Sequence, residues 1–101
     1  MDSGTVDCER KEGKLTIRLQ GSFDYGVVVK LKRLLETQSK ASEYVIDLQE
    51  ATYINSSAFG AMVYIKEKFS ASNDEISIIN ASPSIMKLLK SVHFDQLFRV
   101  V

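Results

Sequence analysis

The sequence predicts an α/β sandwich, a mixed sheet of about four or five strands that is covered mainly on one face by helices. Two stretches of strand character, residues 5–10 and 15–19, open the chain on either side of a charged turn. Helical and β-branched segments then alternate along the rest of the sequence. Parallel strands joined through helices use right-handed crossovers, which bring the helices together on one face. We expect one monomeric domain, residues 1–101, because 101 residues with 45% hydrophobic composition suit a single core.

The opening hairpin is indicated by alternation. Leu15, Ile17 and Leu19 alternate with polar residues, which is typical of a strand with one buried face. Gly13 lies in the charged turn before this strand, where a glycine permits a positive φ. We therefore expect residues 5–10 to form an edge strand that pairs with it.

A first helix is expected over residues 26–38. Val28, Leu31 and Leu35 recur at helical spacing, and the charged residues between them are expected to face water. The next apolar run, residues 44–48, is short and β-branched, which is typical of a buried strand.

The stretch that follows this strand is where we expect the function to lie. A polar loop leads into a helix expected over residues 57–69. At about 100° per residue, the core stripe of this helix comprises Ala58, Met62, Ile65 and Phe69. Phe59, Val63 and Tyr64 lie off the stripe, so the helix has more apolar surface than its core face needs. Such an excess favours a partner protein, and the alternative is that Phe59 packs under a neighbouring helix.

The last part of the chain continues the alternation. Residues 75–80 are β-branched and apolar, which predicts a third buried strand. Ser82 as N-cap and Pro83 at the first helical position predict a helix over residues 83–90. Residues 98–101 are a candidate edge strand.

Composition and residue types exclude several classes of function. Thirteen Lys and Arg balance thirteen Asp and Glu, so the chain lacks the positive charge of proteins that bind nucleic acid or anionic membranes. No stretch approaches the roughly 18 apolar residues of a membrane span. The only cysteine, Cys8, excludes an internal disulfide, which fits a cytoplasmic protein. His93 is the only histidine and has no partner at metal-ligand spacing, so we expect no metal, no cofactor and no catalytic residue.

A family resemblance rests on residues 47–60, which read DLQEATYINSSAFG. This run resembles the motif of STAS domains, the anti-sigma factor antagonists, in which DL-x-x-(V/L)-x-(F/Y)-(I/M)-D-S-S-G-L-G joins a strand to a helix. Asn55 stands where the family usually has Asp, and Ala58 where it usually has Gly. Residues 19–24 and 80–83 are similar to two further family segments, so the resemblance covers nearly the whole chain. It implies a STAS-type sandwich.

The resemblance also implies a phosphorylation site. Ser56 aligns with the serine that is phosphorylated in the family, and Thr52 and Ser57 are the alternative acceptors. Asp24 and Asn55 are expected to support phosphorylation. For Asp24 the alternative is loop support, since an acid at the end of a strand commonly satisfies a neighbouring loop. For Ser56 the alternative is that its hydroxyl only caps the helix.

The partners that the resemblance implies are a serine kinase, which also acts as an anti-sigma-type regulator, and a PP2C-type phosphatase. The unmodified domain would bind the kinase through Ser57, Phe59, Val63 and Tyr64, and phosphorylation would end that binding. The output is a sigma factor or another pathway, such as biofilm or surface-polysaccharide control. The alternatives are a constitutive STAS subunit of a larger assembly, such as a lipid-transport or signalling scaffold, and a STAS domain that binds a small ligand or nucleotide.

Overall fold

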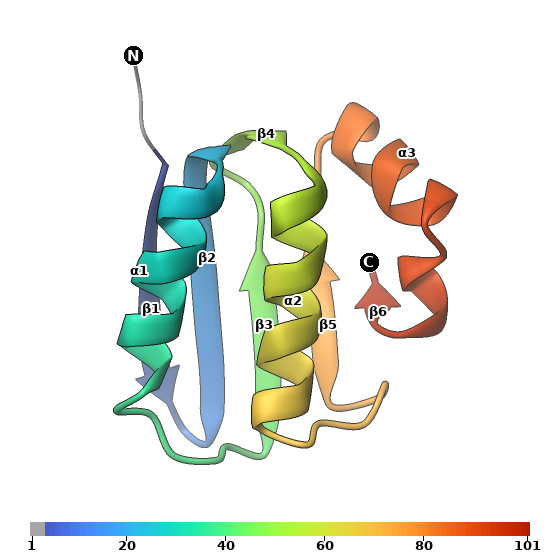
Figure 1. Ribbon diagram of the computed structural model, residues 1–101. Helices are drawn as coiled ribbons and strands as arrows, with labels where there is room; N and C mark the ends of the chain where they lie inside the picture. The colour runs from blue at the N-terminus through green and yellow to red at the C-terminus, as the bar shows by residue number, and fades with distance from the viewer. Residues whose placement is uncertain (1–3) are drawn as a thin grey trace.

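The structure is a computed structural model that describes residues 4–101; residues 1–3 of the expected domain lie outside the described residues. The described chain forms a six-stranded sheet and three α-helices (Figure 1). The elements in chain order are β1 Thr5–Lys11, β2 Lys14–Phe23, α1 Tyr25–Leu35, β3 Glu43–Asp47, β4 Ala51–Ile54, α2 Ser56–Lys68, β5 Ile76–Ile79, α3 Pro83–Ser91, a short 3-10 helix η1 Phe94–Gln96, and β6 Arg99–Val100. The α/β sandwich predicted from the sequence is confirmed.

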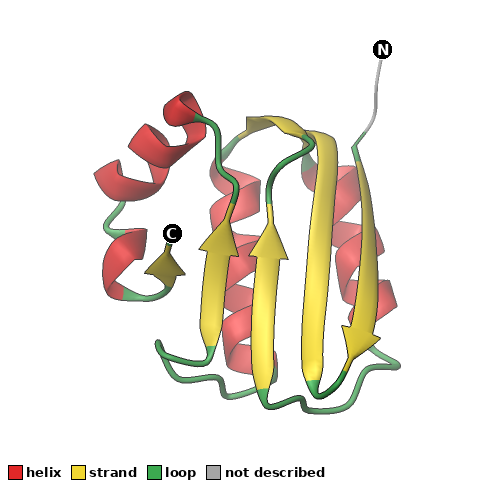
Figure 2. Ribbon diagram, turned by 180° about the vertical axis from the view of Figure 1, so that it is seen from behind, coloured by secondary structure: helices red, strands yellow, loops and turns green. Residues whose placement is uncertain are grey.

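The sheet is mixed, with strand order β1-β2-β3-β5-β6 and with β4 paired to the end of β2. β1 runs antiparallel to β2, and the other pairs are parallel. Helices α1 and α2 lie side by side across one face (Figure 1), and the view from behind shows the strands uncovered (Figure 2). The sheet has one strand more than expected because β4 lies inside the stretch predicted as a polar loop.

The core lies between the covered face of the sheet and helices α1 and α2. Strand side chains of alternating positions supply one side of it, and Leu15, Ile17 and Ile46 are fully buried there. On α2 the predicted stripe is buried from Ala58 to Phe69, whose ring stacks on Tyr44 with centroids 4.6 Å apart. The period of the apolar residues therefore located the core face of this helix correctly.

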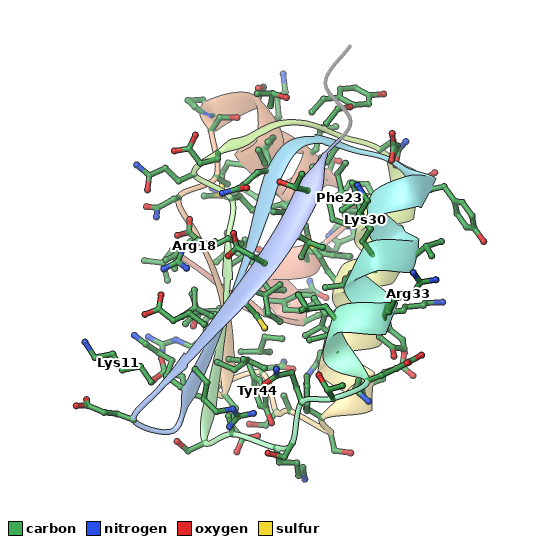
Figure 3. All side chains as sticks on the ribbon, turned by 90° about the vertical axis from the view of Figure 1, so that its left-hand side faces the viewer. Lys11, Arg18, Phe23, Lys30, Arg33 and Tyr44 are labelled. Carbon is green, nitrogen blue, oxygen red and sulfur yellow. The ribbon has the colours of Figure 1, made fainter. Side chains whose placement is uncertain are left out.

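The open face of the sheet carries charged side chains. Arg18, which points away from α1 in Figure 3, lies 3.1 Å from Glu9 and 3.8 Å from Asp7. Its Nε lies 3.9 Å from a carboxylate oxygen of Asp47. Asp47 also accepts hydrogen bonds from the Gln49 backbone N–H and the Asn80 amide. These contacts give Asp47 the loop-supporting role expected of an acid at the end of a strand.

Both ends of α1 differ from the prediction for local reasons, while α2 and α3 differ by one residue at most at each end. α1 begins at Tyr25 because Asp24 accepts a hydrogen bond from the Val27 N–H and so acts as N-cap. The helix ends at Leu35, short of residue 38, and a turn follows in which Gln38 N–H donates to the Leu35 carbonyl. Helix α3 starts at Pro83 behind the Ser82 cap, as predicted.

Candidate functional site: two helix N-termini at one edge of the sheet

The pairing of β2 with β4 places two helix N-termini next to each other. The strands are parallel, and Phe23 at the end of β2 is opposite Ile54 at the end of β4. The following residues, Asp24 and Asn55, are the N-caps of α1 and α2. Neighbouring strands lie about 4.8 Å apart, so the two caps stand side by side at the same edge of the sheet. Residues far apart in the sequence are thus brought to one site, at the upper ends of α1 and α2 in Figure 1.

Both caps are side-chain oxygens bonded to backbone N–H groups. Asp24 Oδ1 accepts from Val27 N at 3.2 Å, and Asn55 Oδ1 accepts from Ser57 N at 2.9 Å. Ser56 is the first residue of α2 and is exposed. The alternative role considered for Ser56, a helix cap, is therefore wrong: the residue before it caps the helix. The Ser56 hydroxyl is accessible, and the start of α2 does not depend on it.

The segment before Ser56 is a strand, not a loop. β4 pairs with β2 through Gly21, Ser22 and Phe23, with a shift of register between the first two. Gly21 has a φ of 76°, a conformation that glycine adopts readily, and its N–H donates to the Glu50 carbonyl at 2.8 Å. Ala51 and Ile54 are buried, which anchors both ends of β4. Ser56 therefore follows a strand whose two end residues are packed in the core.

The apolar residues predicted to bind a partner line two shallow grooves on either side of α2. The α2–η1 groove, about 420 Å³, is lined by Phe59, Gly60, Val63, Tyr64, Glu67 and Phe94. The α1–α2 groove, about 300 Å³, is lined by Tyr25, Val28, Lys32, Ser57, Gly60, Ala61 and Tyr64. All four residues proposed from the sequence, Ser57, Phe59, Val63 and Tyr64, therefore line one groove or both.

Phe59 belongs partly to the fold. Its side chain is half-buried, and its ring meets the ring of Phe94 edge to face with centroids 5.2 Å apart. Phe94 in turn is buried against Phe98. Phe59 therefore packs against the 3-10 helix η1 with part of its ring, as the alternative from the sequence proposed. The exposed part of the ring lines the α2–η1 groove.

Two exposed aromatic residues near Ser56 were missed from the sequence. Tyr25, the first residue of α1, is 72% exposed, and Tyr53, on β4, is 58% exposed. Tyr53 lies three residues before Ser56 in the chain, whereas Tyr25 reaches the site through the pairing of β2 with β4, which the sequence pattern did not reveal. Lys32 was expected to be an ordinary solvated residue, but its Nζ lies 5.2 Å from the centre of the Tyr64 ring and so links α1 to α2.

Other reactive side chains lie away from this site. Partial burial, with the Asp7 carboxylate as a second cause, raises the pKa of the Cys8 thiol, so the less nucleophilic thiol form predominates at neutral pH. Within residues 4–101, no three His, Cys, Asp or Glu side chains are grouped as metal ligands would be. Over the same residues, no helix has the length and apolar character needed to cross a bilayer.

Comparison with known proteins agrees with the geometry. The STAS domain model matches residues 5–101. A STAS-domain containing protein of Pseudomonas aeruginosa strain UCBPP-PA14 is 36% identical over 88 residues, which cover 86% of this chain and 87% of that protein. Two solved structures share the fold at low sequence identity. An anti-sigma factor antagonist from Mycobacterium paratuberculosis has a TM-score of 0.77 at 16% identity, covering 97% of this chain and 85% of that one.

The second solved structure is the Bacillus cell fate determinant SpoIIAA in its phosphorylated form, with a TM-score of 0.68 at 18% identity. The match covers 95% of this chain and 90% of that one. The family model spans nearly the whole chain, and the Pseudomonas relative is similar over most of its length. The chain therefore belongs to the STAS domain family.

Proposed function

We propose that this STAS domain is a binding module whose partner is exchanged by phosphorylation. The unmodified chain binds a serine kinase of the anti-sigma type, the kinase phosphorylates Ser56, and the modified chain is released until a PP2C-type phosphatase removes the phosphate. The observation that carries the proposal is the exposed hydroxyl of Ser56, which stands at a helix N-terminus already capped by Asn55. We place this cycle in the cytoplasm, where ATP is available. A sigma factor, or biofilm or polysaccharide control, is the output.

A phosphate on Ser56 is compatible with the fold. It adds about −1.5 to −2 charges at the N-terminus of α2, where the helix dipole and free N–H groups favour an anion. Since Asn55 supplies the cap, modification removes no intramolecular hydrogen bond from the helix. The modification should act on the partner, because the added charge and bulk stand one helical turn before Gly60, which lines both apolar grooves.

Asp24 and Asn55 have separate roles in this proposal. Asn55 holds the first turn of α2 without adding negative charge beside the acceptor hydroxyl. Asp24 is the acid beside it, on the neighbouring helix start, and is suited to help position the acceptor or the metal–nucleotide of the kinase. The cap on α1 and the support of phosphorylation are compatible, because capping uses one carboxylate oxygen.

The proposal is tested with the purified chain, Mg-ATP and a purified candidate serine kinase from the same organism. Mass spectrometry is expected to place one phosphate on Ser56, and Ser56→Ala is expected to abolish it while unfolding at an unchanged temperature. Ser84→Ala is the matched control, an exposed serine in the first turn of α3, and should be modified like the parent. Phosphate on Thr52 or Ser57 in the Ser56→Ala variant, at the level of the parent, would mean that one of these residues is the acceptor instead of Ser56. A kinase complex with no modification at all would instead favour the constitutive assembly subunit.

Asp24→Asn separates the two roles of Asp24. Asparagine caps a helix about as well as aspartate, so the free energy of unfolding should change by less than about 0.5 kcal/mol. Without the carboxylate, the rate of Ser56 phosphorylation should fall at least about tenfold, or about 1.4 kcal/mol in the barrier. The rate is followed by transfer of labelled phosphate and the stability by urea titration. An unchanged rate would leave Asp24 with the capping role alone.

A further inference from the structure

We propose that the α1–α2 groove seats an apolar segment of the kinase that carries a carboxylate. The kinase chain packs against the bare backbone of Gly60, and its carboxylate pairs with Lys32. This inference rests on the proposed function and identifies the part of the STAS surface that recognises the kinase. It is carried by two independent features, a glycine that the fold does not require and a groove whose lining bears only positive charge.

Gly60 has no intramolecular reason to be glycine. It lies in the interior of α2, exposed, and a Cβ built on it would meet no atom of residues 4–101 within 4 Å, the backbone of its own turns apart. Gly4 is the opposite case, because a Cβ there would lie 2.2 Å from the Ser22 carbonyl oxygen. Glycine within a helix is less favourable than alanine, so at position 60 the chain forgoes stability. A close approach by another molecule explains why.

The position of Gly60 shows where that approach occurs. Gly60 lines both the α1–α2 groove and the α2–η1 groove, and the missing side chain leaves a low point between them on the surface of α2. Ser57 stands one turn before it, so a chain packed on Gly60 passes directly beside the N-terminus that carries Ser56. A phosphate on Ser56 then lies against the same segment.

The charge of the groove defines the occupant. Of the residues that line the α1–α2 groove, Lys32 is the only charged one. Its Nζ lies 5.2 Å from the centre of the Tyr64 ring, and both residues line the groove. Lys30 and Arg33 lie on the other side of α1, where they line a separate groove with Val6 and Thr37. A carboxylate that an apolar segment places at Lys32 is therefore complementary to the groove.

The glycine is tested by Gly60→Ala, with affinity for the kinase measured by calorimetry. The variant should unfold about 2–8 °C higher than the parent, because alanine is the better helix former. It should nevertheless bind the kinase at least about tenfold more weakly, since the methyl group occupies the point of contact. Lys87→Ala, on the exposed side of α3, is the control and should leave affinity unchanged. A Gly60→Ala chain that binds as the parent does would overturn the proposal.

The charge is tested by Lys32→Glu against Lys30→Glu. Both change the same charge on the same helix, but Lys30 lies on the side of α1 toward β1, where its Nζ donates to the Gly4 carbonyl (Figure 3). Lys32→Glu should weaken binding at least about tenfold at low salt, and the loss should shrink as salt is raised. Equal effects of the two variants would overturn the assignment of the groove. If the parent chain does not bind the kinase, both this inference and the proposed function are wrong. If the parent binds and the variants bind with the same affinity, this inference is wrong and the proposed function stands.

Discussion

Ser56→Asp is expected to weaken binding to the kinase by about 2–5 kcal/mol, a factor of roughly 30 to several thousand. The substitution places a carboxylate at the first residue of α2, beside the apolar grooves. In the complex this charge is taken out of water without a partner, which is the costly arrangement for a buried ion. The aspartate carries less charge than a phosphate, so its effect is a lower bound on that of phosphorylation.

The same substitution should leave the isolated domain folded. An acid in the first turn of a helix interacts favourably with the dipole, and Asn55 continues to cap. The unfolding temperature should therefore stay within a few degrees of the parent's. Ser84→Asp makes the same change in the first turn of α3 and should retain full affinity. Calorimetric titration of the kinase with each variant gives the comparison, and parental affinity of Ser56→Asp would mean that the switch lies elsewhere.

Leu31→Ala is expected to lower the free energy of unfolding by about 2–5 kcal/mol. Leu31 is fully buried at the middle of α1, between that helix and the sheet, so truncation removes apolar contacts and leaves a cavity. A domain of this size has a total stability of about 5–15 kcal/mol, so the loss is a large part of the whole. Since α1 supplies one wall of the α1–α2 groove, the site should weaken with it.

Urea unfolding followed by circular dichroism measures this loss. Arg33→Ala is the control on the same helix, because Arg33 is exposed and surface substitutions usually change stability by less than about 0.5 kcal/mol. A change in Leu31→Ala as small as that of the control would mean that α1 is not held by its core stripe.

Periodicity could predict the fold because each helix buries one stripe and each strand one face. The stripe of α2 from Ala58 to Phe69 and the alternation of Leu15, Ile17 and Leu19 are local patterns, and both were correct. β4 escaped prediction because only Ala51 and Ile54 are buried in it, while Thr52 and Tyr53 are exposed, so the strand has no alternating signal. Its pairing with β2 joins residues that are far apart in the sequence, so no local pattern reveals it.

The site was predicted in part for the same reason. Ser56 was proposed from a motif, and its position at the start of a helix followed from the local pattern. The cap by Asn55 is local, because its side chain accepts from the N–H of Ser57 two residues on, and asparagine is a common N-cap. The neighbouring position of Asp24 and the nearness of the exposed Tyr25 ring depend on the register between β2 and β4. No stretch of sequence contains that register.

The parallel pairing of β2 with β4 also makes the candidate site depend on the folded state of the domain. The strands are separated in the chain by α1 and β3, so their pairing is non-local and requires the chain to close a long loop. An unfolded chain therefore presents neither the paired helix starts of Asp24 and Asn55 nor the groove between α1 and α2. The kinase that we propose as partner should therefore bind only the folded domain. An unfolded copy of the chain should therefore not compete for the kinase.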